Sequence, residues 1–353
     1  MQLVRLATWM VCTTCSLGAS YGNGQTLRIL NWEAFLSEDT ISQWEARTGA
    51  SIEQIYFDND ENRNSLLTSY DQTTIDLVVI DQVSAPVFGR RGVLLPVSAY
   101  SGTPNLSHID PQWKAQCGEY GTPYLWGTMG LAYRKDILTL PPSSWSALLN
   151  PAPELTGHIG LLEDYVDTLA PSLLKRGASV NTADESLLAE VFEELRSLLP
   201  AVLTFEYPIT FVGSYPNADD LHLALAYSGD QYELNDMSGG DVWGYTIPEE
   251  GTVLWIDCLA VLANSPNKAL AFDFINFINQ PDVAAANSEA VFVATPNASA
   301  LPLQSTAFRS NTLIYPDEAT LAKSQHYDFA MANENVRLRN RITSSLVNIH
   351  ESQ

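Results

Sequence analysis

Basic residues are scarce in this chain of 353 residues, which carries 18 Lys and Arg against 41 Asp and Glu. The formal net charge at pH 7 is −23 with histidine neutral. An acidic surface of this kind repels nucleic acid and anionic lipid and attracts cations. The charge therefore argues against a nucleic-acid partner and for a cationic one, unless it serves solubility alone.

Long hydrophobic runs are also missing, so the sequence predicts no transmembrane helix and no stable membrane insertion. An apolar stretch at 6–20 is too short to span a bilayer. It follows a positively charged start at 1–5, and small residues at 18–20 form a cleavage region. Residues 1–20 therefore have the features of a secretory signal peptide, which predicts an exported protein.

Cysteine is rare, with four residues in the chain, and signal cleavage would remove Cys12 and Cys15. Cys117 and Cys258 would remain in an oxidising compartment, where disulfides form and persist. They either form a disulfide or stay two separate buried thiols, and the sequence favours neither.

Motifs of several enzyme classes are absent. The chain has no Gly-x-x-x-x-Gly-Lys-Ser/Thr loop, no Gly-x-Gly-x-x-Gly after a strand and no Gly-x-Ser-x-Gly elbow. Its five histidines are scattered without metal-ligand spacing, so we predict neither a cofactor nor a metal. The acids Glu163, Asp164 and Asp167 leave a secreted hydrolase as the enzyme alternative, because glycosidases use acid pairs. We nevertheless expect a protein that is not an enzyme.

Apolar patterns alternate between strand and helix in the first part of the chain. Strands are predicted at 27–32, 51–57 and 76–80, and the last is a continuous apolar run that suits a parallel strand buried on both faces. Between the first two, a helix capped by Ser37 is expected to end at Gly49. This alternation predicts an α/β lobe with helices on both sides of a sheet.

A second series of elements begins near residue 128 and predicts a second α/β lobe. Thr182 and Glu185 form a capping box for an amphipathic helix at 182–199, which Pro200 ends. The other predicted elements are strands at 129–133, 158–162, 221–227 and 252–263 and a helix at 268–279 closed by Pro281.

Two long strand-like passages, at 125–133 and 254–263, are candidates for crossings between the lobes. Two crossings would allow the lobes to hinge about a cleft.

Short motifs of the sequence resemble those of one family. Residues 30–35 (LNWEAF) resemble the YNW-x-x-Y opening of bacterial spermidine/putrescine periplasmic binding proteins, a family that includes polyamine-sensing relatives. Six further motifs follow in the family's order, at 57–61 (FDNDE), 76–79 (DLVV), 122–127 (TPYLWG), 255–257 (WID), 295–297 (TPN) and 315–317 (YPD). The resemblance covers nearly the whole mature chain.

The resemblance implies a fold, a function and partners. The implied fold is α/β, a type II-like periplasmic binding protein of two lobes, each a mostly parallel sheet flanked by helices, with the ligand cleft between them. The lobes would comprise 25–128 plus 257–300 and 129–256 plus 301–353. The implied function of this monomer is periplasmic binding of a polyamine of the spermidine, norspermidine or putrescine type. Its partner would be an inner-membrane ABC permease or, alternatively, a membrane-bound sensor receptor that reads occupancy.

A polyamine site needs carboxylates for the ammonium groups and aromatic faces for the methylenes. In the first lobe the resemblance implies Trp32, Glu33 and Phe35, with Phe35 replacing a Tyr. Trp32 is either the aromatic wall or a core residue. Glu33 either compensates for the family acid that Ala34 replaces or is a solvated surface acid. Asp81 follows a strand where relatives have Ser, and either binds an ammonium or caps the next helix.

In the second lobe, Asp164 and Asp167 match two acids of the spermidine binders. Three-residue spacing at the start of a helix would place them on one face, although a helix N-terminus also stabilises acids without any ligand. Tyr227 stands where the family has Trp, and Asp230 matches an acid of the putrescine-binding branch.

Trp255 and Asp257 form the strongest predicted pair, because Trp-x-Asp on a strand places both side chains on one face. In the family this face lines the cleft and the acid holds an ammonium. The alternative is that Asp257 is a buried acid paired with an internal Arg or Lys.

Two departures alter the aromatic part of the implied site. Val293 and Tyr327 stand where the family has a Tyr and a Gln. Together with the added acids, they favour a triamine of other spacing than spermidine or a diamine. A binding protein for another small cationic metabolite, such as thiamine, remains the second class of function.

Overall fold

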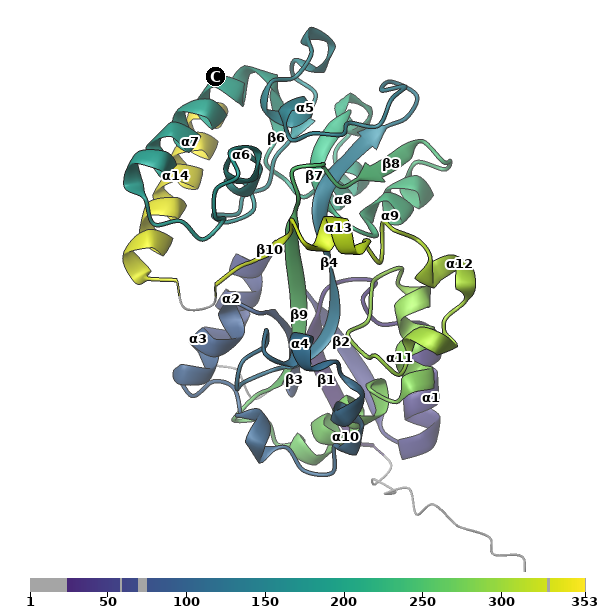
Figure 1. Cartoon of the computed structure of the whole chain (residues 1–353). Helices are drawn as coiled ribbons and strands as arrows, with labels where there is room; N and C mark the ends of the chain where they lie inside the picture. The colour runs from purple at the N-terminus through teal and green to yellow at the C-terminus, as the bar shows by residue number, and fades with distance from the viewer. Residues whose placement is uncertain (1–23, 58, 69–74, 329–330, 353) are drawn as a thin grey trace, which may run out of the picture.

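Two lobes joined through one continuous sheet make up the structure (Figure 1). The computed structural model describes residues 24–57, 59–68, 75–328 and 331–352. The predicted signal peptide at 1–20, with Cys12 and Cys15, lies outside the described residues. Within these residues the sheet has ten strands: β1 (Thr26–Asn31), β2 (Ser51–Tyr56), β3 (Leu77–Asp81), β4 (Thr122–Arg134), β5 (Ile159–Gly160), β6 (Val202–Thr204), β7 (Leu223–Tyr227), β8 (Trp243–Thr246), β9 (Val253–Val261) and β10 (Gln325–His326).

The strand order explains how the lobes are joined. The strands lie in the order β2-β1-β3-β9-β4-β7-β5-β6, with β10 beside β9 and β8 beside β4. β4 pairs with β9 through residues 122–128 and with β7 through 129–133, so this one strand belongs to both lobes. β2, β1 and β3 are parallel, as are β6, β5 and β7, whereas β9 and β4 run antiparallel to their neighbours β3 and β7 and to each other. The predicted two-lobe α/β fold is confirmed.

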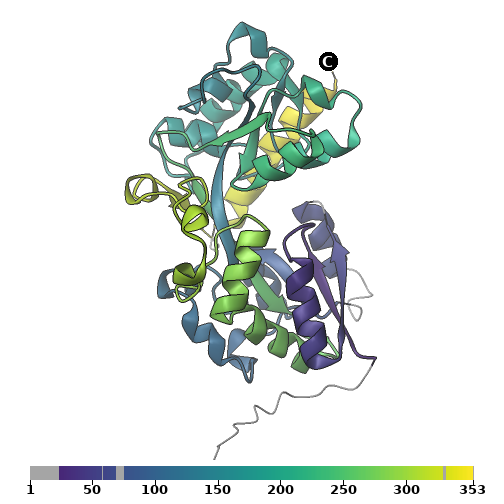
Figure 2. The same cartoon turned by 90° about the vertical axis from the view of Figure 1, so that its right-hand side faces the viewer.

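Helices flank the sheet in both lobes (Figures 1 and 2). Figure 2 shows α1 beside α11 on the first lobe, while α14 packs on α7 in the second lobe. No helix within the described ranges is both long and apolar enough to cross a membrane. The helices are α1 (Glu38–Thr48), α2 (Asp60–Thr68), α3 (Ser84–Arg90), α4 (Pro111–Lys114), α5 (Ser146–Leu149), α6 (Ala170–Lys175), α7 (Glu185–Leu198), α8 (Pro208–Ser214), α9 (Asp230–Met237), α10 (Lys268–Ile278), α11 (Pro281–Ala290), α12 (Thr306–Arg309), α13 (Glu318–Leu321) and α14 (Asn333–Glu351).

Local sequence signals set both ends of α1 as predicted. The Ser37 hydroxyl accepts a hydrogen bond from the Thr40 N–H, which satisfies a free donor of the first turn. Gly49 ends the helix with a φ of 75°, a left-handed conformation that glycine adopts without strain. The helix buries Trp44 against the first-lobe core.

Two residues predicted to mark helix ends have other roles in the structure. Asp184 and not Thr182 caps α7, because the Asp184 carboxylate accepts hydrogen bonds from the first N–H groups of the helix, and no capping box forms. Pro281 begins α11, while α10 already ends at Ile278. Proline suits the first helical position, since its missing N–H would have no helical partner there.

The hydrophobic core is divided between the lobes. Leu30 and Phe57 of the first lobe share one cluster with Phe308 and Ile314. Leu346 of α14 belongs instead to the cluster of the second lobe. The chain around α12 and α13 therefore packs on the first lobe before α14 joins the second lobe. The residue boundaries of the lobes stay a proposal.

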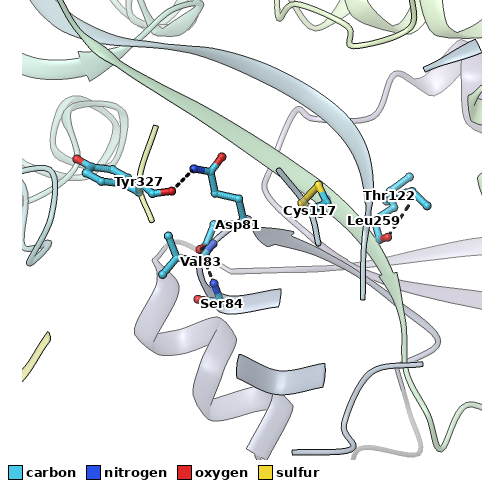
Figure 3. The surroundings of a disulfide bond; sticks show 9 residues. Asp81, Val83, Ser84, Cys117, Thr122, Leu259 and Tyr327 are labelled. Carbon is cyan, nitrogen blue, oxygen red and sulfur yellow. Dashed lines mark hydrogen bonds between the residues drawn. A yellow bond between two sulfur atoms is a disulfide. The ribbon is translucent and has the colours of Figure 1, made fainter. Parts of the chain in front are cut away.

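Cys117 and Cys258 form a disulfide with a Cα–Cα distance of 5.9 Å (Figure 3). Both residues are fully buried, and the bond ties the segment before β4 to the middle of β9. Because Cys258 directly follows Asp257, the disulfide fixes the strand that carries one of the predicted site residues. Of the two alternatives left open by the sequence, the structure therefore has the disulfide.

Candidate functional site

The predicted acids Asp81 and Asp257 lie side by side in the first lobe. Asp81 is the last residue of β3, and its Cα is paired with that of Asp257 in the antiparallel register of β3 and β9. Trp255 precedes Asp257 by two residues on β9, so both side chains are on one face of the strand, as predicted. The pairing of two strands that are distant in sequence thus creates the acid pair.

Both oxygens of Asp81 are engaged within the protein. Oδ1 accepts hydrogen bonds from the N–H groups of Val83 and Ser84, each at 2.8 Å, and so caps the start of α3 (Figure 3). Oδ2 accepts a 2.7 Å bond from Arg63, so Asp81 forms an ion pair. Although burial opposes ionisation, the charge of Arg63 and the hydrogen bonds together lower the pKa of Asp81. Of the two roles considered for Asp81, the helix cap is present in this structure.

Arg63 also pairs with Asp60 at the start of α2, with 2.7 Å between Nη1 and Oδ1. The Arg63 side chain is 0% exposed and that of Asp60 is 42% exposed. The surrounding protein raises the pKa of Asp60 by desolvation, Arg63 opposes the rise, and the charges of Asp81 and Asp164 add to it. Because Asp60 is partly exposed, water screens these effects.

Asp257 has no such partner. The residue is 7% exposed, and nowhere in the described part of the chain does a group donate a hydrogen bond to its carboxylate. Burial and the charges of Asp81 and Asp60 raise the pKa of Asp257 to about 8, against the attraction of Arg63. The predicted alternative, an ion pair of Asp257 with an internal cation, is not what this structure has, because Arg63 pairs with Asp60 and Asp81 instead.

In the second lobe, Asp164 and Asp167 lie in a turn. The sequence predicted the start of a helix here, but α6 begins only at Ala170. Asp164 Oδ1 accepts bonds of 2.7 Å from the N–H groups of Val166 and Asp167, and Thr168 N–H bonds the Asp164 carbonyl, so the turn has helical character. The carboxylate therefore caps its own turn.

Asp167 is held by two tyrosines. Tyr227 and Tyr327 donate their hydroxyl hydrogens to its two oxygens, each at 2.6 Å. Burial and the charge of Asp167 raise the pKa of both tyrosines, so the hydroxyls remain donors. Burial raises the pKa of Asp167, although the two hydroxyl bonds lower it. Tyr327, which the sequence showed only as a departure from the family, is thus part of the site.

Acids of the two lobes lie close enough to raise one another's pKa. Burial and then the charge of Asp167 raise the pKa of Asp164 to about 7, and the first-lobe Asp81 contributes as well. Asp60 and Asp81 likewise raise the pKa of Asp167. We call this group the interlobe acids: Asp60, Asp81, Asp164, Asp167 and Asp257.

A second buried cation lies nearby without forming an ion pair with the interlobe acids. Burial lowers the pKa of Arg339 on α14, and the negative charge of Asp164 opposes this shift. The hydrogen bonds of Arg339 go to the Asn335 side chain and to the carbonyls of Val180 and Thr182. Among the described residues, Arg63 is therefore the cation that pairs with the interlobe acids.

Asp230 is linked to the interlobe acid Asp167 through Tyr227 and has its own hydrogen-bond partners. Its Oδ1 accepts a 2.6 Å bond from the Tyr207 hydroxyl, and its Oδ2 a 2.7 Å bond from the Tyr227 N–H. Burial raises the pKa of Asp230 to about 7, with a further contribution from Glu233. Asp230 thus positions the backbone of Tyr227, whose hydroxyl holds Asp167.

Aromatic rings connect the two lobes along the site. Trp32 lies 4.3 Å from Phe57 and 6.4 Å from Phe35, measured between ring centroids. Phe35 lies 6.4 Å from Trp255, which meets Tyr227 edge-on at 6.1 Å. The predicted Trp32, Phe35, Trp255 and Tyr227 therefore form one series, which we call the aromatic wall.

Glu33 is the predicted residue that stands apart. Its side chain is exposed, and within the described residues it makes no hydrogen bond or ion pair. Its charge still raises the pKa of Glu233 in the second lobe, after burial and Asp236. Of the two alternatives for Glu33, the solvated acid describes this structure.

Sequence reasoning missed Arg63, Asp60 and Tyr207. Asp60 lies inside the motif at 57–61, and an acid three residues before an arginine on a helix is a signal for an ion pair. The contact of Tyr207 with Asp230 had no comparable local signal.

The arrangement is suited to a cation with several charges. Carboxylates of both lobes lie within range of one another's charge, and Arg63 is paired with two of them. The aromatic wall includes Trp255 beside Asp257 and Tyr227 bonded to Asp167. Carboxylates and aromatic faces both attract alkylammonium groups. In the described residues, no three His, Cys, Asp or Glu side chains are arranged to hold a metal ion.

Comparison with known proteins gives consistent matches. The model of the family described as bacterial extracellular solute-binding protein matches residues 39–314. A protein named norspermidine sensor from Vibrio cholerae is 36% identical over 352 residues, which covers 100% of this chain and 96% of that protein. The spermidine/putrescine-binding periplasmic protein of Escherichia coli K12 is 27% identical over 309 residues, 86% of each chain.

A solved structure agrees with the sequence matches. A structure described as a putative spermidine/putrescine ABC transporter from Listeria monocytogenes superposes with a TM-score of 0.77 at 27% identity. The superposition covers 92% of this chain and 99% of the other.

Proposed function

This chain belongs to the bacterial extracellular solute-binding proteins, and we propose that it binds a polyamine between its two lobes in the periplasm. The observation that carries the proposal is the set of interlobe acids beside the aromatic wall. Asp257 is buried without a hydrogen-bond donor within the described residues, and Asp164 and Asp167 of the other lobe accept hydrogen bonds from neutral donors. Such a set of carboxylates is expected to favour a ligand with several positive charges.

The geometry supports a ligand that contacts both lobes. An ammonium at Asp257 would be held by the first lobe, and one at Asp164 or Asp167 by the second lobe. The methylenes between the ammonium groups would lie along Trp255 and Phe35. A ligand that contacts both lobes stabilises the closed arrangement more than the open one, which is how occupancy becomes a signal for a partner.

Two outputs follow from the same binding event. The protein delivers the polyamine to an inner-membrane ABC permease, or it reports occupancy to a membrane-bound sensor receptor. The 36% identity to the norspermidine sensor over the whole chain, against 27% to the E. coli periplasmic binding protein, favours the sensor output. Pull-down of the mature protein on the periplasmic domains of receptors and permeases, with and without amine, would separate the two.

We propose binding without turnover. Of the acids Glu163, Asp164 and Asp167 that left a hydrolase open, Asp164 caps its own turn and Asp167 is held by two tyrosine hydroxyls. We also keep the monomeric state and the lobe boundaries 25–128 plus 257–300 and 129–256 plus 301–353 as parts of the proposal, except that Phe308 and Ile314 pack with the first lobe.

The direct experiment is thermal unfolding of refolded mature protein, free of copurified ligand, with putrescine, cadaverine, norspermidine, spermidine and spermine. A ligand at a hundredfold excess over its Kd stabilises the folded state by about 2.7 kcal/mol. We expect a clear rise of Tm with at least one amine, recovery of that amine unchanged, and no rise with thiamine. The absence of any rise with all five amines would overturn the proposal, and a rise with thiamine alone would favour the second class of ligand.

A further inference from the structure

Arg63 occupies an unusual position for a basic residue in a site for cations. Its side chain is fully buried, and the guanidinium donates to Asp60 and Asp81 at 2.7 Å and to the Ser84 hydroxyl at 3.0 Å. Its Cζ lies 5.7 Å from the centre of the Phe57 ring, which contacts the Trp32 ring at a tilted angle. Two carboxylates and an aromatic face are the surroundings expected for an ammonium of a polyamine.

Resting on the proposed function, we propose that Arg63 is a specificity-determining residue whose guanidinium takes the place of one ligand ammonium at the Asp60–Asp81 end of the site. The ligand then meets only the remaining interlobe acids, Asp257, Asp164 and Asp167. Three carboxylates match a triamine. A fourth ammonium would have to displace a buried guanidinium that is already paired.

The contrast between the two neighbouring acids of β3 and β9 supports this division. Asp81 and Asp257 are paired in register, yet only Asp81 contacts Arg63. The low pKa of Asp81 and the raised pKa of Asp257 agree with the geometry, because one charge is compensated inside the protein and the other is not. A cation from outside is therefore needed at Asp257 and is redundant at Asp81.

The hydrogen bonds of Arg63 also explain why a ligand ammonium would not displace its guanidinium. The guanidinium has further hydrogen bonds to the Asn64 side chain, at 3.1 and 3.3 Å. Its planar set of donors is matched by four side chains at once, which an ammonium cannot reproduce. Displacing it would leave a buried charge without partners.

The test is a comparison of amines by isothermal titration in the wild type and in Arg63→Met. The wild type should prefer norspermidine or spermidine to spermine. In Arg63→Met, the freed acids Asp60 and Asp81 should accept a fourth ammonium, and the affinity for spermine relative to the triamine should rise about tenfold or more. The matched control is the double variant Asp60→Asn with Arg63→Met, in which most of this gain should be lost.

Two further variants keep the test decisive. Arg63→Lys retains a cation at the same place and should retain the preference for triamines. If circular dichroism shows that Arg63→Met is unfolded, Arg63→Gln should give the same gain for spermine, because it is neutral but still bonds to the carboxylates. Folded Arg63→Met or Arg63→Gln with the wild-type ratio of affinities would overturn the role of Arg63. A wild type that binds no polyamine would instead overturn the proposed function.

Discussion

The two lobes hold their carboxylates in different ways. In the first lobe, Asp60 and Asp81 are paired with Arg63, a cation that cancels negative charge. In the second lobe, Asp164 and Asp167 are held by backbone N–H groups and tyrosine hydroxyls, which are neutral. Neutral donors fix the orientation of a carboxylate but leave its charge available to a ligand.

This difference indicates where the ligand charge must be bound. In the first lobe the uncompensated acid is Asp257, and in the second lobe both turn acids remain uncompensated. A polycation held by both sets draws the lobes together, whereas one held by either set alone would not. The comparison therefore predicts one ammonium-binding carboxylate in the first lobe, Asp257, and two in the second lobe, Asp164 and Asp167.

The largest expected effect comes from Asp257→Asn. The change removes the uncompensated charge of the first lobe and should weaken polyamine binding by about 2–5 kcal/mol, as for loss of one partner of a buried charge pair. The ligand-free variant should fold as stably as the wild type or more so, because burial and repulsion disfavour this charge. Isothermal titration and denaturant unfolding measure the two quantities.

Asp81→Asn is the matched control for that prediction. It removes a partner of Arg63 and should mainly destabilise the fold, with a smaller loss of affinity than Asp257→Asn. If Asp81→Asn weakened binding more than Asp257→Asn while folding normally, the division between compensated and uncompensated acids would be wrong.

The second expected effect is a dependence of affinity on pH. The pKa of Asp257 is about 8 and that of Asp164 about 7, both raised first by burial. A bound ammonium favours the ionised carboxylates, and alkylammonium groups themselves titrate only near about 10. Binding should therefore release protons, and affinity should fall as the pH is lowered from 8.5 to 6, by about tenfold per pH unit for each released proton. Titrations in buffers of different ionisation enthalpy count the protons.

Stability of the ligand-free protein should follow the opposite trend. The folded-state pKa values of Asp257 and Asp164 lie above the unfolded value of about 3.9, so the folded state binds more protons between these limits. Their contribution to the free energy of unfolding is complete below about pH 4 and is lost as the pH rises through 7 and 8. Asp257→Asn should flatten this profile, and an unchanged profile would contradict the raised pKa.

The fold was largely predictable because its signals are local. The Ser37 cap and the Gly49 stop set α1, and the apolar run of 76–80 became β3 with a shift of one residue. The error at Asp164 has a local cause as well. An i, i+3 spacing is shared by a helix and by a single helical turn, and only the packing of the following residues decides between them.

The contacts of the site were less predictable because they depend on tertiary structure. The resemblance to the polyamine-binding family supplied Asp257 and Trp255, but not the cross-strand pairing of Asp257 with Asp81. The bond from Tyr327 to Asp167 joins residues 160 positions apart. No spacing rule in the sequence connects them, so the neutral hydrogen-bond donors of the second-lobe acids became visible only in the structure.

A smaller effect is expected when the neutral donors of the second lobe are removed. Tyr227→Phe and Tyr327→Phe each delete one hydroxyl bond to Asp167, which should raise its pKa further and weaken binding by about tenfold. Tyr207→Phe is the comparison variant and should lose less affinity, because its hydroxyl bonds to Asp230, which acts on Asp167 only through the backbone of Tyr227. Equal losses in all three variants would show that the tyrosines act through packing and not through the Asp167 carboxylate.

The smallest effect is expected for Glu33→Gln. Glu33 is exposed and reaches the second lobe only through its charge, which is felt at Glu233. Exposed charges of this kind contribute about 0–1 kcal/mol and act mainly on the rate of association. We expect a decrease of about twofold to threefold in the association rate at low salt, an unchanged dissociation rate, and no difference at high salt. Stopped-flow measurements with Trp fluorescence separate the two rates. A slower association that persists at high salt, or a loss of affinity as large as that of Asp257→Asn, would mean that Glu33 contacts the ligand directly and that the first lobe has a second point of attachment.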